Sequence, residues 1–311
     1  MTNPADRQSK KERQNAAREK ARIMREEAKK KARRNRLFLQ GGIGLGVLVV
    51  LAVIAIVVVQ VAKPTTSAGP ANMLSDGIVL TSTTDYVSTA AVENKGKPTP
   101  TKQADDDKAH ITLYEDLQCP VCKAFEDASD PQIEQWLNAG TATVEIHPVS
   151  ILDRLSSGNK YSTRAANAMA CVAQYDPKDF WAVNKAFYAN QPEENGNGLT
   201  DKQIIANIKS GGVSSSQVSD CVTSQKFTGW VGAATDRITP PGTTFPNSKA
   251  KVPATGFGTP SIIVNGQLYT PPTSSQLGFG DADAFAAFVK ATVPGWTGGT
   301  ASPTPSATPA G

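Results

Sequence analysis

Two cysteines separated by two residues are the side chains best suited to chemistry in this sequence. Cys119 and Cys122 enclose Pro120 and Val121 in the segment QCPVCKAFE. The residues before them, 110–117, alternate apolar and polar side chains like a strand, and those after them predict a helix. A cysteine that opens a helix meets unpaired backbone N–H groups and the positive end of the helix dipole, which favour a thiolate. We therefore expect a depressed pKa at Cys119.

The spacing of the pair also suits disulfide exchange. Two intervening residues let the sulfurs meet across one turn, and Pro120 fits the first helical position, where an N–H is not needed. Cys119 would face solvent and Cys122 would lie partly buried beneath it, so substrate thiolates would exchange through Cys119. The alternatives are a closed structural bridge or half of a zinc site, and the strand-to-helix position favours redox chemistry over both.

The other candidate ligands and thiols predict structural roles. Cys171 and Cys221 lie in separate predicted helices, with 49 residues between them. A structural bridge is expected, with a second redox relay as the alternative. His110 and His147 fall in predicted strands, and their spacing matches no zinc pattern, so we expect no metal site.

The N-terminal part of the chain predicts a membrane anchor. Residues 1–36 hold 14 Lys and Arg against 5 acids, and residues 37–62 carry no charged side chain. An apolar stretch of this length predicts one transmembrane helix, and the positive-inside rule keeps the basic segment in the cytoplasm and everything after the span outside it. A cleaved signal peptide is less consistent with the length and with the lack of an Ala-x-Ala site. The basic residues suit orientation on anionic lipid better than binding of nucleic acid.

The remaining chain predicts one domain between two polar segments. Residues 63–107 are rich in Thr, Ser, Pro, Ala and Gly, which indicates a flexible extracytoplasmic linker with a possible short strand at 77–81. Residues 108–296 predict, in order, a strand, a helix broken or kinked at Pro131, a strand at 142–152, a helical block, a hairpin at Asn265-Gly266 and a closing helix. Residues 297–311 predict a disordered tail.

Three segments resemble a known family. YEDLQCPVCKAFE, FWAVNKAFYANQPEENGNGLTDKQI and GTPSIIVNG are similar to the bacterial DsbA-like thioredoxin family, especially its membrane-anchored Gram-positive and actinobacterial members. The similarity covers roughly residues 77–293. It implies an α/β (α+β) thioredoxin-like fold with a DsbA-type helical insertion at about 158–225. It also implies a thiol-disulfide oxidoreductase whose only redox group is the Cys119–Cys122 disulfide, with no dissociable cofactor.

The resemblance assigns further residues to the site. Pro260 would be a cis-proline facing the sulfurs, and Thr259 would offer backbone groups to an extended substrate. A trans Pro260 at the start of an edge strand is the alternative. Glu115 and Asp116 match acidic positions of relatives and would pass protons to Cys122, unless they are solvated strand-end charges. Val121 replaces the His of enteric DsbA and cannot stabilise a thiolate in the same way.

The partners that the resemblance implies are exported proteins with free thiols or disulfides. An oxidase would be reoxidised by a quinone-linked membrane partner of the DsbB or vitamin K epoxide reductase-like type. A reductase or isomerase, supplied with electrons from across the membrane, is the second enzymatic hypothesis. A chaperone-like binding module with a structural Cys119–Cys122 bridge is the non-enzymatic one.

Overall fold

The computed structural model describes residues 68–104, 106–296 and 298, together with residues 15, 18–20, 22, 24–27 and 29–31. The chain divides into two units, Met1–Lys63 and Pro64–Gly311. The expected span at 37–62 and nearly all of the expected tail at 297–311 lie outside the described residues. No helix within the described part is long and apolar enough to cross a membrane.

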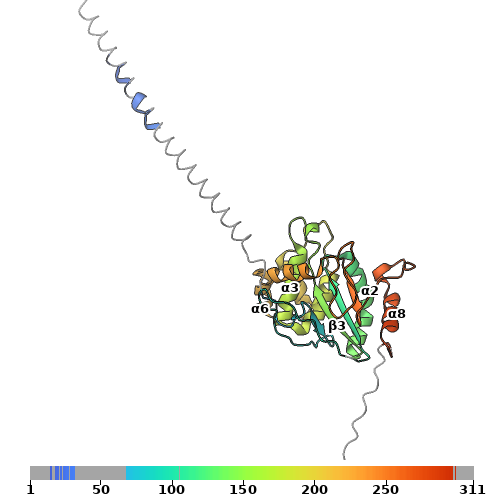
Figure 1. The fold of residues 1–311 in the computed structure, drawn as a ribbon. Helices are drawn as coiled ribbons and strands as arrows, with labels where there is room; N and C mark the ends of the chain where they lie inside the picture. Colours follow the sequence, from blue (N-terminus) through green and yellow to red (C-terminus); the bar gives the residue numbers. More distant parts are fainter. Residues whose placement is uncertain are drawn as a thin grey trace, which may run out of the picture. The chain divides into compact units, whose positions relative to one another are not determined.

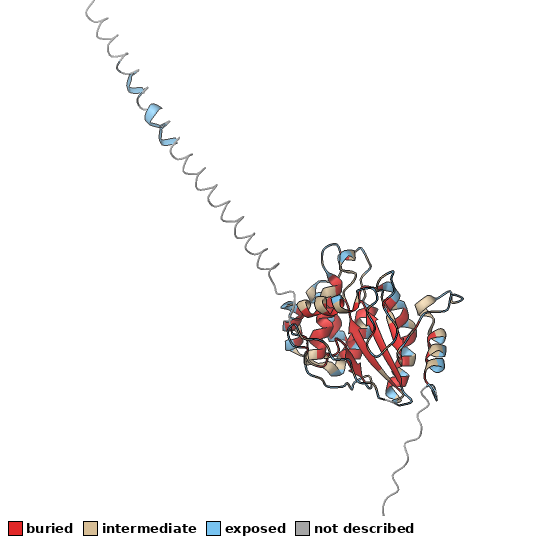
Figure 2. Cartoon of the chain, viewed as in Figure 1, coloured by how far each residue is buried: buried red, intermediate tan, exposed pale blue. Residues whose placement is uncertain are grey.

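A five-stranded mixed sheet forms the centre of the second unit (Figure 1). The spatial order is β1-β3-β2-β4-β5, in which β2 and β3 run parallel and the other neighbours are antiparallel. The strands, listed along the chain, are β1 (Ile78–Leu80), β2 (Ala109–Glu115), β3 (Ala142–Pro148), β4 (Ser261–Val264) and β5 (Gln267–Leu268). Strands β2 and β3 are buried along almost their whole length, as Figure 2 shows.

Alternation along β2 divides the core into two parts. Ile111 and Leu113 point into the larger cluster, which the helices cover. Tyr114 points to the opposite face. That face is closed by a smaller cluster, whose members come from β2, β4 and the chain between β3 and β4: Tyr114, Val149, Ile238, Phe245, Val252 and Ile263. Successive side chains at the end of β2 therefore enter the larger and the smaller cluster in turn.

Helix α2 (Pro120–Asn138) packs beside α8 (Ala282–Thr292) through aromatic side chains. The rings of Phe125 and Phe285 meet edge to face, with centroids 5.0 Å apart. The expected break at Pro131 does not occur, since α2 continues through it. Buried residues on both sides of the proline, including Phe125 and Trp136, hold the two halves against the same core.

The helical insertion lies between β3 and β4 and comprises five α-helices among the described residues. They are α3 (Tyr161–Tyr175), α4 (Phe180–Ala189), α5 (Asp201–Ser210), α6 (Ser216–Thr223) and α7 (Thr228–Ile238). The insertion extends beyond the expected limit of 225, because α7 buries Trp230, Val231 and Ala234 in the same core. Short 3-10 helices cover Asp153–Leu155, Pro177–Asp179 and Gly278–Gly280.

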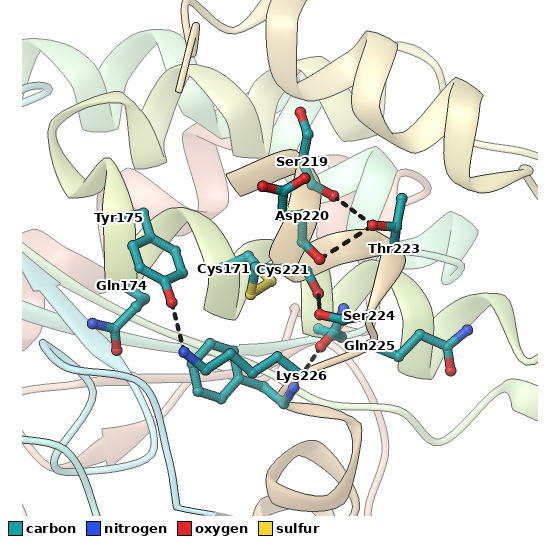
Figure 3. Close-up of a disulfide and its surroundings, with 12 residues drawn as sticks. Cys171, Gln174, Tyr175, Ser219, Asp220, Cys221, Thr223, Ser224, Gln225 and Lys226 are labelled. Carbon is teal, nitrogen blue, oxygen red and sulfur yellow. Dashed lines mark hydrogen bonds between the residues drawn. A yellow bond between two sulfur atoms is a disulfide. The ribbon is translucent and has the colours of Figure 1, made fainter. Parts of the chain in front are cut away.

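A disulfide between Cys171 and Cys221 joins α3 to α6 inside this insertion (Figure 3). Both cysteines are buried, and their Cα atoms are 5.8 Å apart, within the usual range for a bridge. Lys226 Nζ donates to the Tyr175 hydroxyl oxygen at 2.5 Å beside it. The bridge therefore crosslinks two helices that are separate in the sequence.

The prediction of a flexible linker over 63–107 is wrong for its described part. Met73, Ile78, Leu80 and Val92 are buried there, and β1 pairs with β3 at the edge of the sheet. Composition indicated a linker because Thr, Ser, Pro and Gly outnumber the apolar residues, but a few well-spaced apolar side chains suffice to fix the segment. Only the short strand expected at 77–81 is confirmed within it.

The hairpin between β4 and β5 follows the Asn-Gly prediction. Asn265 and Gly266 have φ values of 43° and 80°, the left-handed conformation that a two-residue turn between twisted strands requires. A Cβ at Gly266 would also lie 2.8 Å from the carbonyl oxygen of Asn247. This turn returns the chain so that β5 pairs antiparallel with β4.

Candidate redox site

Cys119 occupies the N-cap of α2, with Pro120 at the first helical position. The turn from β2 into this helix is held by Asp116. Its backbone oxygen accepts from the Cys119 N–H at 2.8 Å, and its carboxylate accepts from three N–H groups, those of Gln118 (2.9 Å), Ile151 (2.8 Å) and Leu152 (3.0 Å). This fully buried side chain fixes the cysteine at the mouth of the helix.

The surroundings of Cys119 favour its thiolate. A hydrogen bond from the Cys122 thiol is the largest influence and outweighs burial, and the hydroxyl of Thr259 and the backbone N–H groups of Cys122 and Val121 add to it. Together they lower the pKa of Cys119 from 9.0 to about 6. Both cysteines of the pair are free thiols here. Of the two sulfurs, Cys119 therefore has the surroundings that favour a nucleophilic thiolate at neutral pH.

Cys122 is the opposite case. It is 1 % exposed, and burial, followed by the neighbouring Cys119 and the charge of Glu115, raises its pKa well above 9.0. The residue accordingly stays a thiol while Cys119 ionises. A thiol of this kind attacks or leaves only if its proton is exchanged with a nearby group.

The loop before β4 closes the other side of the sulfur. The Thr259–Pro260 peptide bond is cis, and Cys119 Sγ lies 3.3 Å from the Thr259 carbonyl oxygen, to which it donates when it is protonated. Ser261, the next residue, pairs with Tyr114 in β2. The sheet register thus brings Thr259 and Pro260 to the reactive sulfur from about 140 residues away in the chain.

Glu115 and Asp116 occupy different environments, although the sequence suggested one role for both. Burial raises the pKa of Glu115 to about 7 and that of Asp116 to about 6. Asp116 is bound by three backbone N–H groups, whereas Glu115 Oε1 receives no hydrogen bond from the described residues. Glu115 also acts on Cys122 electrostatically. Of the two carboxyl groups, Glu115 is the one that keeps an oxygen without a hydrogen-bond donor among the described residues.

Val121 lies in the exposed first turn of α2, 43 % accessible. Its side chain is apolar, so its contribution to the Cys119 thiolate comes from its backbone N–H alone. The adjacent exposed surface is therefore suited to contact with an apolar part of a substrate rather than to stabilisation of charge.

The sequence analysis missed several polar residues around the pair. Gln191 Nε2 donates to the carbonyl oxygens of Leu117 and Cys119, at 3.1 and 3.0 Å. Glu126 and Asp130 follow Cys122 at intervals of four residues on a buried face of α2. That spacing was visible as a signal, because carboxylates rarely fall on the core face of a helix. Gln191 sits in an irregular segment after α4 and left no such pattern.

The two histidines lie apart from the cysteine pair. His110 contacts Thr143 and Asp106 through its two ring nitrogens, at 2.9 and 3.0 Å. The ring of His147 stacks on Tyr114 with centroids 4.3 Å apart. Among the residues that the structure describes, no group of three His, Cys, Asp or Glu side chains has the geometry of a metal site.

Comparisons with known proteins agree with this geometry. A family described as thioredoxin matches residues 104–278. Reduced DsbA from Mycobacterium tuberculosis is 24% identical, with a TM-score of 0.51 over 72% of this chain and 95% of that chain. Oxidised DsbA from the same organism is 26% identical, with a TM-score of 0.50 over 71% and 95%. The search of curated proteins gives no match.

Proposed function

The chain belongs to the thioredoxin family and is a protein thiol-disulfide oxidoreductase, and we propose that it acts as a DsbA-like oxidase on exported proteins. The observation that supports the proposal is that the pKa values of the two thiols are shifted in opposite directions. The pKa of Cys119 is lowered to about 6, while that of Cys122 is raised well above 9.0. A stabilised Cys119 thiolate lowers the free energy of the reduced pair, so the oxidised pair gives up its disulfide readily.

The exchange is balanced in electrons and protons. A substrate thiolate attacks Cys119 Sγ of the oxidised pair, the Cys119–Cys122 bond breaks, and Cys122 leaves with the electron pair and takes up a proton. A second substrate thiolate then attacks the substrate sulfur of the mixed disulfide and releases Cys119 as a thiolate. The substrate has lost two electrons and gained a disulfide, and the pair holds both electrons.

Glu115 supplies the proton that Cys122 needs. It is 2 % exposed, and its pKa of about 7 lets it hold a proton and release it near neutral pH. Thr259 and Pro260 offer their backbone to an extended substrate beside Cys119. The exposed Val121 provides an apolar contact on the same side.

The basic segment and the apolar segment at 37–62 support a single-pass location in the cell membrane. The N-terminus would stay in the cytoplasm and the redox unit outside it, where disulfides persist. A quinone-linked membrane protein of the DsbB or vitamin K epoxide reductase-like type would reoxidise the pair. No dissociable cofactor takes part in the exchange with substrate.

A reductase or isomerase is the second candidate, and Val121 is the observation that favours it. An apolar side chain at this position gives the Cys119 thiolate no donor beyond the backbone, which limits how far the reduced form is stabilised. The direction of net electron flow separates the two candidates.

A direct test follows the transfer of a disulfide. The oxidised full-length chain in detergent is mixed with a reduced, unfolded secreted protein, and free thiols are counted on both. An oxidase forms one substrate disulfide for each Cys119–Cys122 pair that becomes reduced. Cys119→Ser abolishes the transfer, whereas Cys171→Ala with Cys221→Ala retains it. Absence of transfer by the parent protein rejects the proposed function.

A further inference from the structure

The side chain of Gln191 joins the helical insertion to the turn that carries Cys119. Its amide nitrogen Nε2 donates to the carbonyl oxygen of Leu117 at 3.1 Å and to that of Cys119 at 3.0 Å. A side-chain amide has two N–H groups, so both can be used on this turn. The two carbonyl groups lie on either side of Gln118. One side chain of the insertion therefore holds the chain at two points between β2 and α2.

The end of α4 places Gln191 beside this turn. The helix ends at Ala189, and Pro192 disfavours the helical conformation at the residue before it. The backbone N–H of Gln191 donates to the carbonyl oxygen of Tyr188 at 3.3 Å, and Tyr188 is buried. The main chain of Gln191 is thus attached to a buried turn of the insertion, while its side chain is attached to the redox site.

The hydrogen bond to Cys119 acts on the peptide group that joins Cys119 to Pro120. Its carbonyl is the only hydrogen-bonding group of that peptide, because proline has no N–H. The oxygen accepts from the N–H of Lys123 at 3.1 Å inside the helix and from Gln191 outside it. The torsion angle ψ of Cys119, 117°, sets how the first turn of α2 lies relative to the cysteine side chain. Gln191 therefore helps to fix this angle from outside α2.

This angle decides which donors the sulfur meets. The backbone N–H groups of Val121 and Cys122 stabilise the Cys119 thiolate. A hydrogen bond weakens steeply when its distance or alignment is lost. The two N–H groups therefore act on the sulfur only while the first turn of α2 keeps its orientation to the Cys119 side chain.

The hydrogen bond to Leu117 acts on the other side of the turn. The peptide group that holds the Leu117 carbonyl also holds the N–H of Gln118, which donates to the Asp116 carboxylate at 2.9 Å. The atoms of a peptide group lie in one plane, so a bond that fixes the carbonyl also fixes the N–H. Gln191 thus supports from outside the turn that Asp116 holds from within.

We propose that Gln191 is a positioning residue of the redox site, which holds the sulfur of Cys119 against the N–H groups at the start of α2 by fixing the carbonyl groups of Leu117 and Cys119. This inference rests on the proposed function and adds a residue to it. Gln191 acts through the backbone of the redox turn. The helical insertion thereby contributes to the reactivity of the pair through one side chain at the end of α4.

Two titratable side chains face the pair from the neighbouring elements. Cys122 of α2 faces Cys119, and Glu115 of β2 faces Cys122. Burial raises the pKa of Glu115 to about 7, so this carboxyl group titrates in a range that overlaps that of Cys119. Both groups are retained when Gln191 is replaced. A comparison of variant and parent over the same pH range therefore isolates the effect of the hydrogen bonds from Gln191.

The first measurement is the titration of thiolate absorbance in the reduced full-length chain in detergent. Gln191→Met keeps the length of the side chain and removes both donors. The midpoint for Cys119 should rise by about 0.5–1 pH unit, the equivalent of one ordinary hydrogen bond. Asn190→Ala is the matched control, because Asn190 Nδ2 donates to the carbonyl oxygen of Ala186 at the same helix end, at 2.9 Å. It should leave the midpoint at the parental value.

The second measurement separates positioning from a general loss of stability. In the redox equilibrium with glutathione at pH 7, Gln191→Met should favour the reduced pair less than the parent does, by about threefold or more. At pH 5 the difference should nearly vanish, because Cys119 is then largely a thiol in both proteins. Gln191→Ala removes the same donors and should behave like Gln191→Met, which excludes an effect of the methionine side chain itself.

Two results would overturn the inference. One is a midpoint in Gln191→Met equal to that of the parent, and the other is a change in the redox equilibrium of the same size at pH 5 and pH 7. If the parental pair exchanges with glutathione in either case, the proposed function stands without this role of Gln191. If the parental pair does not exchange at any pH, the proposed function falls, and the role of Gln191 falls with it.

Discussion

At the residue scale, the proposed exchange depends on the ionisation of Cys119. Its pKa of about 6 results from the hydrogen bond of Cys122, opposed by burial, and from Thr259 and backbone N–H groups at the helix start. In the reduced protein, thiolate absorbance at 240 nm should titrate with a midpoint near 6, and Cys119→Ser should lose this transition. A midpoint near 9 would contradict the geometry described here.

The same shift makes the stability of the reduced protein depend on pH. Because the folded pKa of Cys119 lies below its ordinary value of 9.0, the thiolate contributes stability that is fully present above about pH 9. This contribution is lost as the pH falls through about 6. The free energy of unfolding of the reduced parent should therefore exceed that of reduced Cys119→Ser by more at pH 8 than at pH 5. If the difference in unfolding free energy is the same at both pH values, Cys119 is not stabilised as a thiolate in the folded protein.

Substitutions of Glu115 and Asp116 should have different effects, the first on the exchange rate and the second on stability. Glu115→Gln removes the proposed proton donor to Cys122 and should slow glutathione release from the Cys119 mixed disulfide at least tenfold at pH 7. Asp116→Ala leaves buried N–H groups unpaired and should lower the free energy of unfolding by about 1–3 kcal/mol. The prediction fails if Glu115→Gln reacts at the parental rate.

The pattern of the sequence identified the cysteine pair but not the two buried carboxyl groups on α2. Cys119 and Cys122 stand out because their spacing and the flanking strand and helix have a local meaning. Glu126 and Asp130 differ from surface acids only through their position on the buried face of α2, which depends on packing against α4. Gln191 reaches the site through a tertiary contact alone.

At the element scale, β1 and its flanking segment are part of the domain. Ile78 is fully buried in the main core, so Ile78→Ala should cost about 2–5 kcal/mol of unfolding free energy. Val87→Ala, at a position 39 % exposed in the same segment, should change stability by about 0.5 kcal/mol or less. Denaturant unfolding of the two variants measures this difference. Equal, negligible effects would restore the interpretation as a linker.

The Cys171–Cys221 bridge closes a loop with a sequence separation of 50. In the chain-entropy description, removal of such a crosslink costs about 4 kcal/mol of stability. Cys171→Ala with Cys221→Ala should therefore unfold at lower denaturant while retaining disulfide transfer at low temperature. Loss of transfer in the folded variant would instead assign the bridge to a redox relay.

Strand and helix positions were largely predictable from periodicity, because β2, α2 and the Asn265-Gly266 turn each carry a local signal. The end of the helical insertion and the ordered segment before β2 could not be predicted in this way. Their structure depends on contacts distant in sequence, such as the ion pair between Asp76 and Arg237 at 2.7 Å. Composition alone does not reveal a partner of this kind.

At the scale of the whole molecule, the proposed anchor at residues 37–62 would place the redox pair on the outer side of a membrane. A membrane-impermeant thiol reagent applied to intact reduced cells should label Cys119, and Cys119→Ser should remove that label. The physical reason is the charge asymmetry around residues 37–62, which in the proposed orientation would keep the basic segment in the cytoplasm. Labelling that appears only after permeabilisation would reverse the orientation.

The most direct measurement of the central claim is the redox equilibrium of the Cys119–Cys122 pair with glutathione in the full-length chain. The stabilised Cys119 thiolate predicts a potential closer to about −120 mV, that of a strong disulfide donor, than to about −270 mV, that of a thiol reductant. A value near the lower figure would assign the protein to the reductants. A pair that never exchanges with glutathione would contradict thiol-disulfide chemistry at this site altogether.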